Sequence, residues 1–549
     1  MFARYTGLKI ILPIFISFLL TNCGSDTESK ISPPTHSVDD VSYKGLVFYH
    51  DNLSTSQYTL NTLSDTTFNA LSIVNKRQVA DKLLSTLFFG YPPKVLEEKI
   101  ASGTFISDTF QALSEEKTDK AWLEEHILDE NIYERNTWDE QVAVDILTRF
   151  YAMKDLDAYF IQNWTAYILT QTIMFSPAYE LESTHTPNIA RVYNRIVSML
   201  KEKSGMRYIT YVHMMSEDNW RRFRSPEDNG REMLEIFTLD MDDSNVPLAA
   251  KALKNWKLDK ESDTLVVSLN QNRKPVNLFS TTVTNGDDFY REMVKSKHFT
   301  LGAITRLVDF FFPTKVATKK TQIINTIIAS KPETWQDILL QIVFSQEYLL
   351  HSTSPKSAEE LFFSTTKKVN FKHRKSSMHS FKRSLENMHQ ASMKYKLGKR
   401  NRVPLDTLSF ANYHKFIRES VLLRKSEPKE INNYMAWDRA GWDESFIANE
   451  NFSFDEKDVV GSLDALVQYL FHTMIARNAT VEELSFFRKH MLEGKVGSQK
   501  LYSTFNMFRT NTDATKQKEK RESLKRNIAI IVLDYISRLS ETYTYKEVK

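Results

Sequence analysis

The segment from Pro226 to Trp256 constrains the fold most strongly, because it contains the pattern of two short amphipathic helices joined by a tight acidic turn. Pro226 suits the first turn of a helix, where the carboxylates that follow it oppose the positive helix end. Short polar side chains at residues 240–245 compete with the backbone for hydrogen bonds and predict the end of that helix. Pro247 then suits the first turn of a second helix.

Each of these two helices is expected to have one apolar side. The apolar residues of the first are Met233, Leu234, Ile236 and Phe237, and those of the second are Leu248, Ala252, Leu253 and Trp256. A short turn keeps the two helices adjacent. We therefore expect Phe237, Leu253 and Trp256 to be buried together.

The amino-acid composition predicts helices for the rest of the chain as well. Glycine (14) and proline (15) are scarce among 549 residues, which favours helices over a turn-rich β architecture. Hydrophobic residues make up 41% of the chain, so a sizeable core is possible. The fold class predicted is mainly α: a multi-helical globular protein with one small β-hairpin insertion, formed by residues 264–269 and 276–284 around a loop at 270–273.

Residues 227–256 also resemble the core motif of a secreted bacterial family known only as domain of unknown function 1800. The matching residues are Glu227, Arg231, Glu232, Glu235, Phe237, Thr238, Leu239, Ala249, Ala250, Ala252, Leu253 and Trp256. Pro226 and Asp228 replace asparagines of the family motif, Asn229 replaces an aromatic residue, and Asp240 and Asn255 replace glycines. The resemblance implies that any site built from those residues is altered here, and it supplies no activity.

The N-terminal sequence predicts export and lipid attachment. Residues 1–22 combine Arg4 and Lys9 with an apolar run from Ile10 to Leu20, which is typical of a signal peptide and too short for a standard spanning helix. Cys23 follows in a sequence that resembles a bacterial lipobox, in which the cysteine becomes the lipid-modified first residue. A lone cysteine is otherwise a small buried hydrophobe. Residues 23–40 are polar and are expected to form a lipidated tether.

Three further regions follow the tether. Residues 41–366 are predicted to form the main helical domain, and residues 403–549 a C-terminal helical region. Between them, Lys367 to Arg402 carries twelve lysines or arginines and one glutamate, with apolar residues at helical spacing. This basic amphipathic segment is either a solvated face or a contact for an anionic surface such as lipid headgroups or a cell-envelope polymer.

Candidate chemistry is confined to a few polar residues. Asp228, Glu232 and Glu235 share one helix face, and paired carboxylates can act as general acid and base where burial separates their pKa values. The alternative is a solvated face, or one paired with a nearby arginine. Glu227 and Arg231 of the same helix are candidate binding residues. Residues 240–245 approach the ligand spacing of a calcium loop but lack its glycine and final glutamate, so a capped turn is favoured.

Trp437 and Trp442 flank a glycine with acids and an arginine nearby, which fits either a stacking surface for sugars or peptides or a loop anchored on the core. No nucleotide-binding, haem or metalloprotease motif is present in the sequence, so neither a metal nor another cofactor is predicted. The net charge of +3 is nearly balanced and predicts no nucleic-acid partner.

These features together predict a lipid-anchored protein of the bacterial cell envelope, in the outer membrane or on the periplasmic face of the inner membrane. A binding or assembly role is favoured over catalysis. The alternatives are a hydrolase that uses Asp228, Glu232 and Glu235, and a glycan-binding helical lipoprotein. The sequence does not decide whether the chain is an enzyme.

Overall fold

The computed structural model describes residues 28–31, 60–125, 128, 140–174, 188–239, 242–259, 264–368, 381, 385, 407, 410, 411, 414, 458–493, 495–496, 499–500, 513–516, 528–529 and 531–548. In this part of the chain the protein is mainly helical, with only short antiparallel strands. The predicted fold class is therefore confirmed. Cys23, Trp437 and Trp442 lie outside the described residues.

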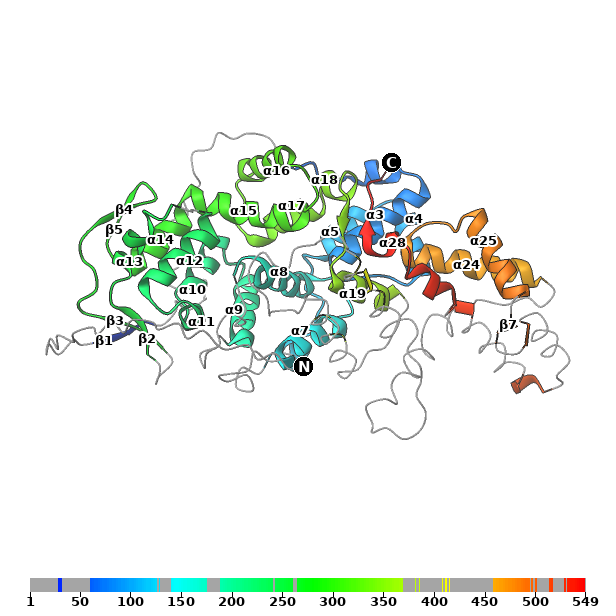
Figure 1. Ribbon diagram of the computed structural model, residues 1–549, viewed down its shortest axis with the longest axis horizontal. Helices are drawn as coiled ribbons and strands as arrows, with labels where there is room; N and C mark the ends of the chain where they lie inside the picture. The colour runs from blue at the N-terminus through cyan, green and yellow to red at the C-terminus, as the bar shows by residue number, and fades with distance from the viewer. Residues whose placement is uncertain are drawn as a thin grey trace, which may run out of the picture.

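The first half of the chain forms helices that run from the right of Figure 1 through its centre to its left part. They are α2 (Asp65–Asn69), α3 (Ile73–Thr86), α4 (Pro93–Ala101), α5 (Phe105–Ala112), α6 (Lys120–Glu125), α7 (Glu140–Ala152), α8 (Ala158–Thr172), α9 (Ile189–Lys201), α10 (Met206–Met214) and α11 (Glu217–Arg222). Side-chain caps start several of them. Asn188, for example, accepts a hydrogen bond from the Arg191 backbone N–H, and Asp157 accepts one from that of Phe160.

The segment 226–256 forms α12 (Pro226–Thr238), α13 (Val246–Ala252) and the start of β2 (Trp256–Asp259). Ser225 caps α12, and Pro226 occupies its first turn as predicted. Phe237, Leu253 and Trp256 are all buried within the hydrophobic cluster, as predicted. One detail is different: Trp256 is not on the second helix, because α13 ends at Ala252 and the chain enters a strand.

Strands form in both predicted segments, 264–269 and 276–284, but they pair differently. The strands at 28–31, within the predicted tether 23–40, and at 256–259 were not predicted. β3 (Thr264–Ser268) lies between β1 (Glu28–Ile31) and β2 in an antiparallel sheet, whereas β4 (Val276–Leu278) pairs with β5 (Thr281–Val283). The predicted pairing of 264–269 with 276–284 is wrong. Phe279 and Ser280 both have positive φ angles, 57° and 61°, which close a two-residue hairpin within the second segment itself.

The remaining described elements complete the helical body. They are α14 (Gly286–Lys295), α15 (Lys297–Phe311), α16 (Ala317–Ala329), α17 (Trp335–Val343), α18 (Gln346–Leu349), β6 (Ser354–Pro355), α19 (Ala358–Lys368), α24 (Val459–Ile475), α25 (Val481–Arg488), the π-helix η4 (Lys489–Glu493), β7 (Lys495–Val496), β8 (Gln499–Lys500), α28 (Ser540–Tyr543) and β9 (Thr544–Tyr545). The apolar run 335–350 predicts one helix but forms two, because the Ser345 side chain caps a new helix at the Tyr348 N–H.

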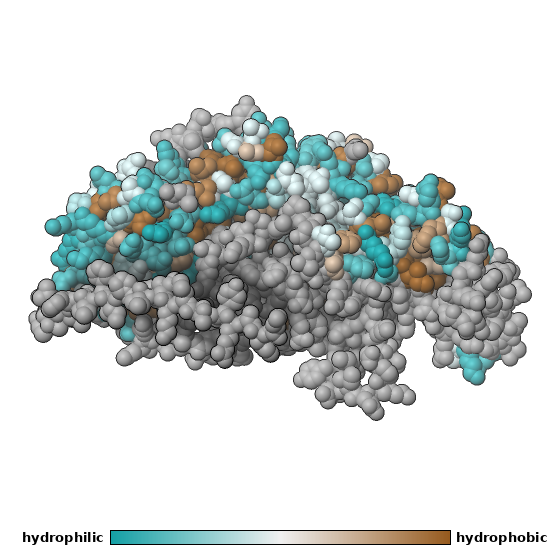
Figure 2. Space-filling model, viewed as in Figure 1, coloured by the Kyte–Doolittle hydropathy of each residue, from teal (hydrophilic) through white to brown (hydrophobic). Residues whose placement is uncertain are grey.

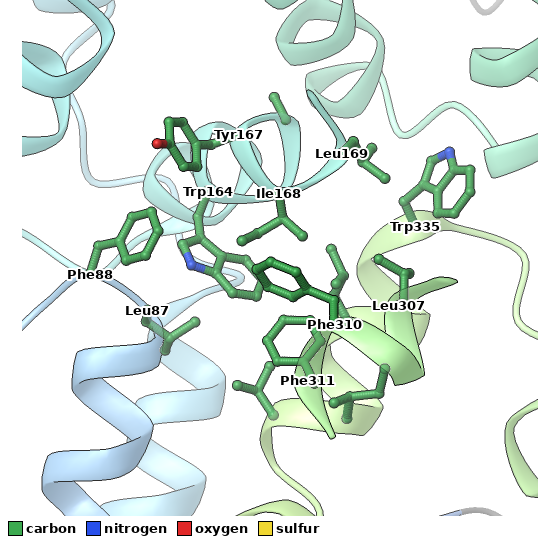
Figure 3. Packing of buried hydrophobic residues seen from close by; sticks show 14 of the residues in the cluster. Leu87, Phe88, Trp164, Tyr167, Ile168, Leu169, Leu307, Phe310, Phe311 and Trp335 are labelled. Carbon is green, nitrogen blue, oxygen red and sulfur yellow. The ribbon is translucent and has the colours of Figure 1, made fainter. Parts of the chain in front are cut away.

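Aromatic side chains from distant parts of the chain build the core. Figure 3 shows Trp164 of α8 directed toward Phe311 of α15, with a ring-centroid distance of 6.3 Å. The Trp164 indole N–H donates to the Thr86 carbonyl at the end of α3 (2.9 Å), so its one polar atom is satisfied in the interior. These contacts join α3, α8 and α15 around one hydrophobic cluster.

The face shown in Figure 2 mixes hydrophilic and hydrophobic residues. In the described part of the chain, no helix combines the length and the apolar character needed to cross a membrane. The first two lysines of the predicted basic segment, Lys367 and Lys368, end α19, and Lys368 is buried. Of the rest of that segment, the structure describes only Phe381 and Leu385, which are buried.

Candidate functional site

The carboxylates singled out from the sequence lie on α12 at the surface of the protein. Asp228 is exposed, and Glu232 and Glu235 are half-buried. Glu227 forms an ion pair with Arg231 across 3.9 Å, in which both side chains are largely exposed. These residues therefore share a helix face, as predicted, but this face does not line the pocket described below.

The acidic turn after α12 is capped, as the sequence favours. The Asp242 carboxylate accepts a hydrogen bond from the Ser244 backbone N–H at 2.9 Å. A hydrogen bond from the Ser244 hydroxyl, and then the one from its backbone N–H, lower the pKa of Asp242. Among the residues that the structure describes, no group of three or more histidine, cysteine, aspartate or glutamate side chains is arranged to hold a metal ion.

A pocket of about 440 Å³ opens between α6, α7, α8 and α9, and we call it the α9 pocket. Its volume falls in the range of small-molecule sites. Most of its polar wall is cationic, and Leu123, Tyr159 and Val197 provide apolar surface. The full lining consists of Lys120, Leu123, Glu124, Arg149, Tyr159, Arg191, Asn194, Arg195, Val197, Ser198 and Lys201.

The helix α9 supplies six of the eleven lining residues. Five polar residues of this helix, each three or four residues from another, form a stripe along it: Arg191, Asn194, Arg195, Ser198 and Lys201. Val197 borders this stripe and also lines the pocket. The opposite side of α9 is buried in the core through Val192, Tyr193, Ile196, Met199 and Leu200. Burial of that apolar side fixes the direction in which the cationic stripe points.

Two carboxylates at the start of α11 hold the arginines of the stripe in place. Asp218 accepts two hydrogen bonds from Arg191, at 2.9 and 2.7 Å, and another from the Asn188 backbone N–H at 2.8 Å. Glu217 lies 3.0 Å from Arg191 and 3.3 Å from Arg195. Burial alone raises the pKa of Asp218, but the hydrogen bond and charge of Arg191, with Arg195, outweigh it and lower that pKa.

Arg149 forms the inner wall of the α9 pocket. Its side chain is buried, donates to the Asn163 side-chain oxygen at 3.2 Å and lies over the Tyr193 ring at 5.6 Å. The Tyr193 hydroxyl also donates to that Asn163 oxygen, at 3.0 Å. This arrangement fixes a buried guanidinium in the pocket wall, between the Tyr193 ring and the Asn163 amide.

The electrostatic balance of the α9 pocket is positive. Five cationic side chains and one carboxylate line it, and when Glu217 and Asp218 are included the cations still outnumber the described carboxylates by two. Guanidinium and ammonium groups bind carboxylates and phosphates through charge-assisted hydrogen bonds. With apolar surface beside them, these groups suit an organic anion.

The pKa of His213 in α10 is also shifted, because this residue is buried next to the network. Burial first, and then the positive charges of Arg195 and Arg222, lower the pKa of His213 to about 3, although Asp218 acts in the opposite direction. His213 is therefore neutral at physiological pH, and it adds no charge behind the pocket wall.

No family model, curated protein or solved structure matches this chain. The resemblance to the family of unknown function therefore stays a prediction. The α9 pocket was not found from the sequence. The spacing of Arg191, Arg195 and Lys201 on an amphipathic helix was the one pattern that pointed to it, whereas Lys120 and Arg149 lie far away in the sequence.

Proposed function

We propose that this chain is a lipid-anchored protein of the bacterial cell envelope that binds a small organic anion in the α9 pocket. The binding role rests on one observation: the excess of cationic side chains around a cavity of about 440 Å³. The proposed anchor at Cys23 rests on the apolar run and the lipobox-like sequence that precede it.

The ligand that fits this pocket has an acidic group and an aromatic or aliphatic body. Lys120, Lys201 and the arginines of α9 would hold the acidic group, and Leu123, Tyr159 and Val197 would contact the body. The partly buried position of Arg195, with 11% of its side chain exposed, strengthens its attraction for an anion relative to a guanidinium in open water. Electrostatic attraction and apolar contact then act together.

Binding of 2-naphthyl phosphate, compared with neutral 2-naphthol, tests this proposal. Isothermal titration calorimetry should show binding of the phosphate ester and at least tenfold weaker binding of the alcohol. Raising the sodium chloride concentration should weaken the binding of the phosphate ester, because exposed charges are screened by salt. Equal binding of the two probes would contradict an anion site.

The double variant Lys120→Gln, Lys201→Gln locates the site. Both lysines are exposed, so their replacement leaves the core and the Arg191–Asp218 pair intact. We expect the affinity for 2-naphthyl phosphate to fall roughly fivefold to thirtyfold, since each removed surface charge contributes on the order of 0.5–1 kcal/mol. Lys251→Gln, an exposed lysine of α13, is the matched control and should bind like the original protein. Unchanged binding by the double variant would place the probe elsewhere.

A further inference from the structure

The two carboxylates at the start of α11, Glu217 and Asp218, contact the arginines of the α9 pocket in different ways. Asp218 has only 1% of its side chain exposed, and it accepts two hydrogen bonds from Arg191 and one from the Asn188 backbone N–H. Asn188 is the residue that caps α9. Asp218 therefore joins α11 to the beginning of α9, and this contact is part of the fold.

Glu217 instead lies between two arginine side chains. A single carboxylate oxygen, Oε1, is 3.0 Å from the Arg191 Nε and 3.3 Å from the Arg195 Nη2. The Glu217 side chain is 14% exposed, so it is less deeply buried than Asp218. Because Asp218 already accepts two hydrogen bonds from Arg191, Glu217 matters most for Arg195, to which it is the nearer of the two carboxylates.

The Arg195 guanidinium is shared between Glu217 and the α9 pocket. Among the described residues, Arg195 lines the pocket and Glu217 does not. The Arg195 Nη2 donates to Glu217 at 3.3 Å and to Asp218 at 3.5 Å, both longer than the roughly 2.7–2.9 Å of a strong charge-assisted hydrogen bond. Its Nη1 is buried and donates to no described residue. Arg195 thus keeps donor capacity for a ligand.

We propose that Glu217 is an internal competitor of the ligand, which occupies the Arg195 guanidinium in the ligand-free protein and lowers the affinity of the α9 pocket for anions. This inference rests on the proposed anion-binding function. An acidic group bound at Arg195 lies near the Glu217 carboxylate, and like charges repel each other.

The same carboxylate stabilises the ligand-free protein. Arg191 and Arg195 are partly buried, with 25% and 11% of their side chains exposed, and a buried charge without a partner is costly. Glu217 compensates part of this charge when no ligand is bound. The result is a pocket that is stable when empty and that releases its ligand readily.

Glu217→Gln tests this competition by isothermal titration calorimetry with 2-naphthyl phosphate. Glutamine has nearly the same size, and Asp218 still holds Arg191, so α9 and α11 keep their contact. The affinity should rise roughly threefold to thirtyfold, because a nearby like charge is removed. Neutral 2-naphthol should bind both proteins equally. Glu98→Gln, at an exposed glutamate of α4, removes the same charge outside the pocket lining and is the matched control, with unchanged affinity expected.

The outcomes separate this inference from the proposed function. If neither the original protein nor Glu217→Gln binds the phosphate ester, the proposed function is wrong and this inference fails with it. If the original protein binds the ester and Glu217→Gln binds it equally or more weakly, only this inference is overturned. A similar rise for 2-naphthol would also overturn it, since the shape of the pocket would then be the cause.

A double-variant cycle tests whether Arg195 is the group for which Glu217 and the ligand compete. Arg195→Gln should weaken the binding of 2-naphthyl phosphate. The addition of Glu217→Gln should then raise the affinity by less than it does when Arg195 is present. The double variant lacks both charges of the pair, so it leaves neither of them without its partner. An equal gain with and without Arg195 would overturn the competition.

Thermal unfolding adds a measurement on the ligand-free protein. Without ligand, Glu217→Gln should have a lower Tm than the original protein, because the two arginines lose one of their carboxylates. At one fixed concentration of 2-naphthyl phosphate, the Tm of the variant should rise by more than that of the original protein, since tighter binding stabilises the folded state more. An equal or smaller rise would overturn the proposal.

Discussion

Gly230 of α12 lies so close to Ala249 of α13 that a β-carbon built on the glycine would stand 2.8 Å from the Ala249 Cβ. Real β-carbons do not approach one another so closely. The two helices of the segment 226–256 therefore pack at a distance that only glycine allows at this position. The residue acts here through its small size, because its φ angle is not among the positive ones.

Gly230→Ala should destabilise the protein, although alanine favours a helix over glycine by about 1 kcal/mol. Overpacking costs roughly 1–3 kcal/mol, and the Ala249 methyl group is fixed to its backbone and cannot turn away. We expect a lower urea midpoint at an unchanged m-value. The double variant Gly230→Ala, Ala249→Gly moves the methyl group from one helix to the other and should recover most of the loss. If the double variant does not recover stability, the close contact between residues 230 and 249 is not the cause of the loss.

Trp256→Ala should lower the Tm sharply. The Trp256 indole lies 6.3 Å from the ring of Trp220 and 6.0 Å from that of Tyr290, and it is buried. Truncation of a core tryptophan costs roughly 3–5 kcal/mol. Glu227→Gln on the exposed side of α12 is the control, and removal of its exposed ion pair with Arg231 should cost about 0–1 kcal/mol. Differential scanning calorimetry measures the Tm of both variants. A similar decrease in Tm for both would contradict the prediction that Trp256 contributes strongly to the core.

Stability should fall as the pH is lowered from about 6.5 toward 4. The unfolded chain binds a proton at His213 with an ordinary pKa, while the folded protein does so only near its pKa of about 3. Protons therefore favour the unfolded state throughout that window, by up to roughly 1.4 kcal/mol per pH unit. The lowered pKa values of Asp81 and Asp218 add to this loss only below about pH 4. His213→Gln should show a shallower dependence of the urea midpoint on pH between 6.5 and 4, and an equal slope would refute this role.

Cys23→Ser should prevent lipid attachment. The variant is expected in the soluble fraction or as an unprocessed precursor, because the acylated thiol is then missing. Metabolic labelling with a radioactive fatty acid, followed by fractionation, measures both effects. Labelling and membrane association that persist in the variant would exclude Cys23 as the anchor.

Local patterns indicate where helices begin, because their causes lie within a few residues. Asn188 starts α9, Pro226 lies in the first turn of α12, and Thr480 forms a capping box with Glu483 at α25. Strand pairing depends on contacts across the fold, so it was not predicted correctly. Phe279 and Ser280 close the β4–β5 hairpin with positive φ angles, although neither residue type favours that conformation.

The α9 pocket was missed for a similar reason. Its lining residues come from four helices, and neither Arg149 nor Lys120 carries a pattern that marks it as part of a site. By contrast, the carboxylates of α12 share a face as their spacing predicts, yet the structure places that face at the surface. Periodicity shows which residues share a helix face. It does not show whether that face meets solvent, another helix or a pocket.

Because β1 pairs with β3, its position limits the distance between the folded protein and the proposed lipid anchor. Four residues separate Cys23 from Glu28, the first residue of the strand. A fully extended chain spans at most about 3.6 Å per residue, so the strand begins no more than about 18 Å from a lipid-modified Cys23. A protein held so tightly cannot tumble freely above the bilayer. If Cys23 carries the lipid, the end of the molecule that contains β1, β2 and β3 stays close to the membrane.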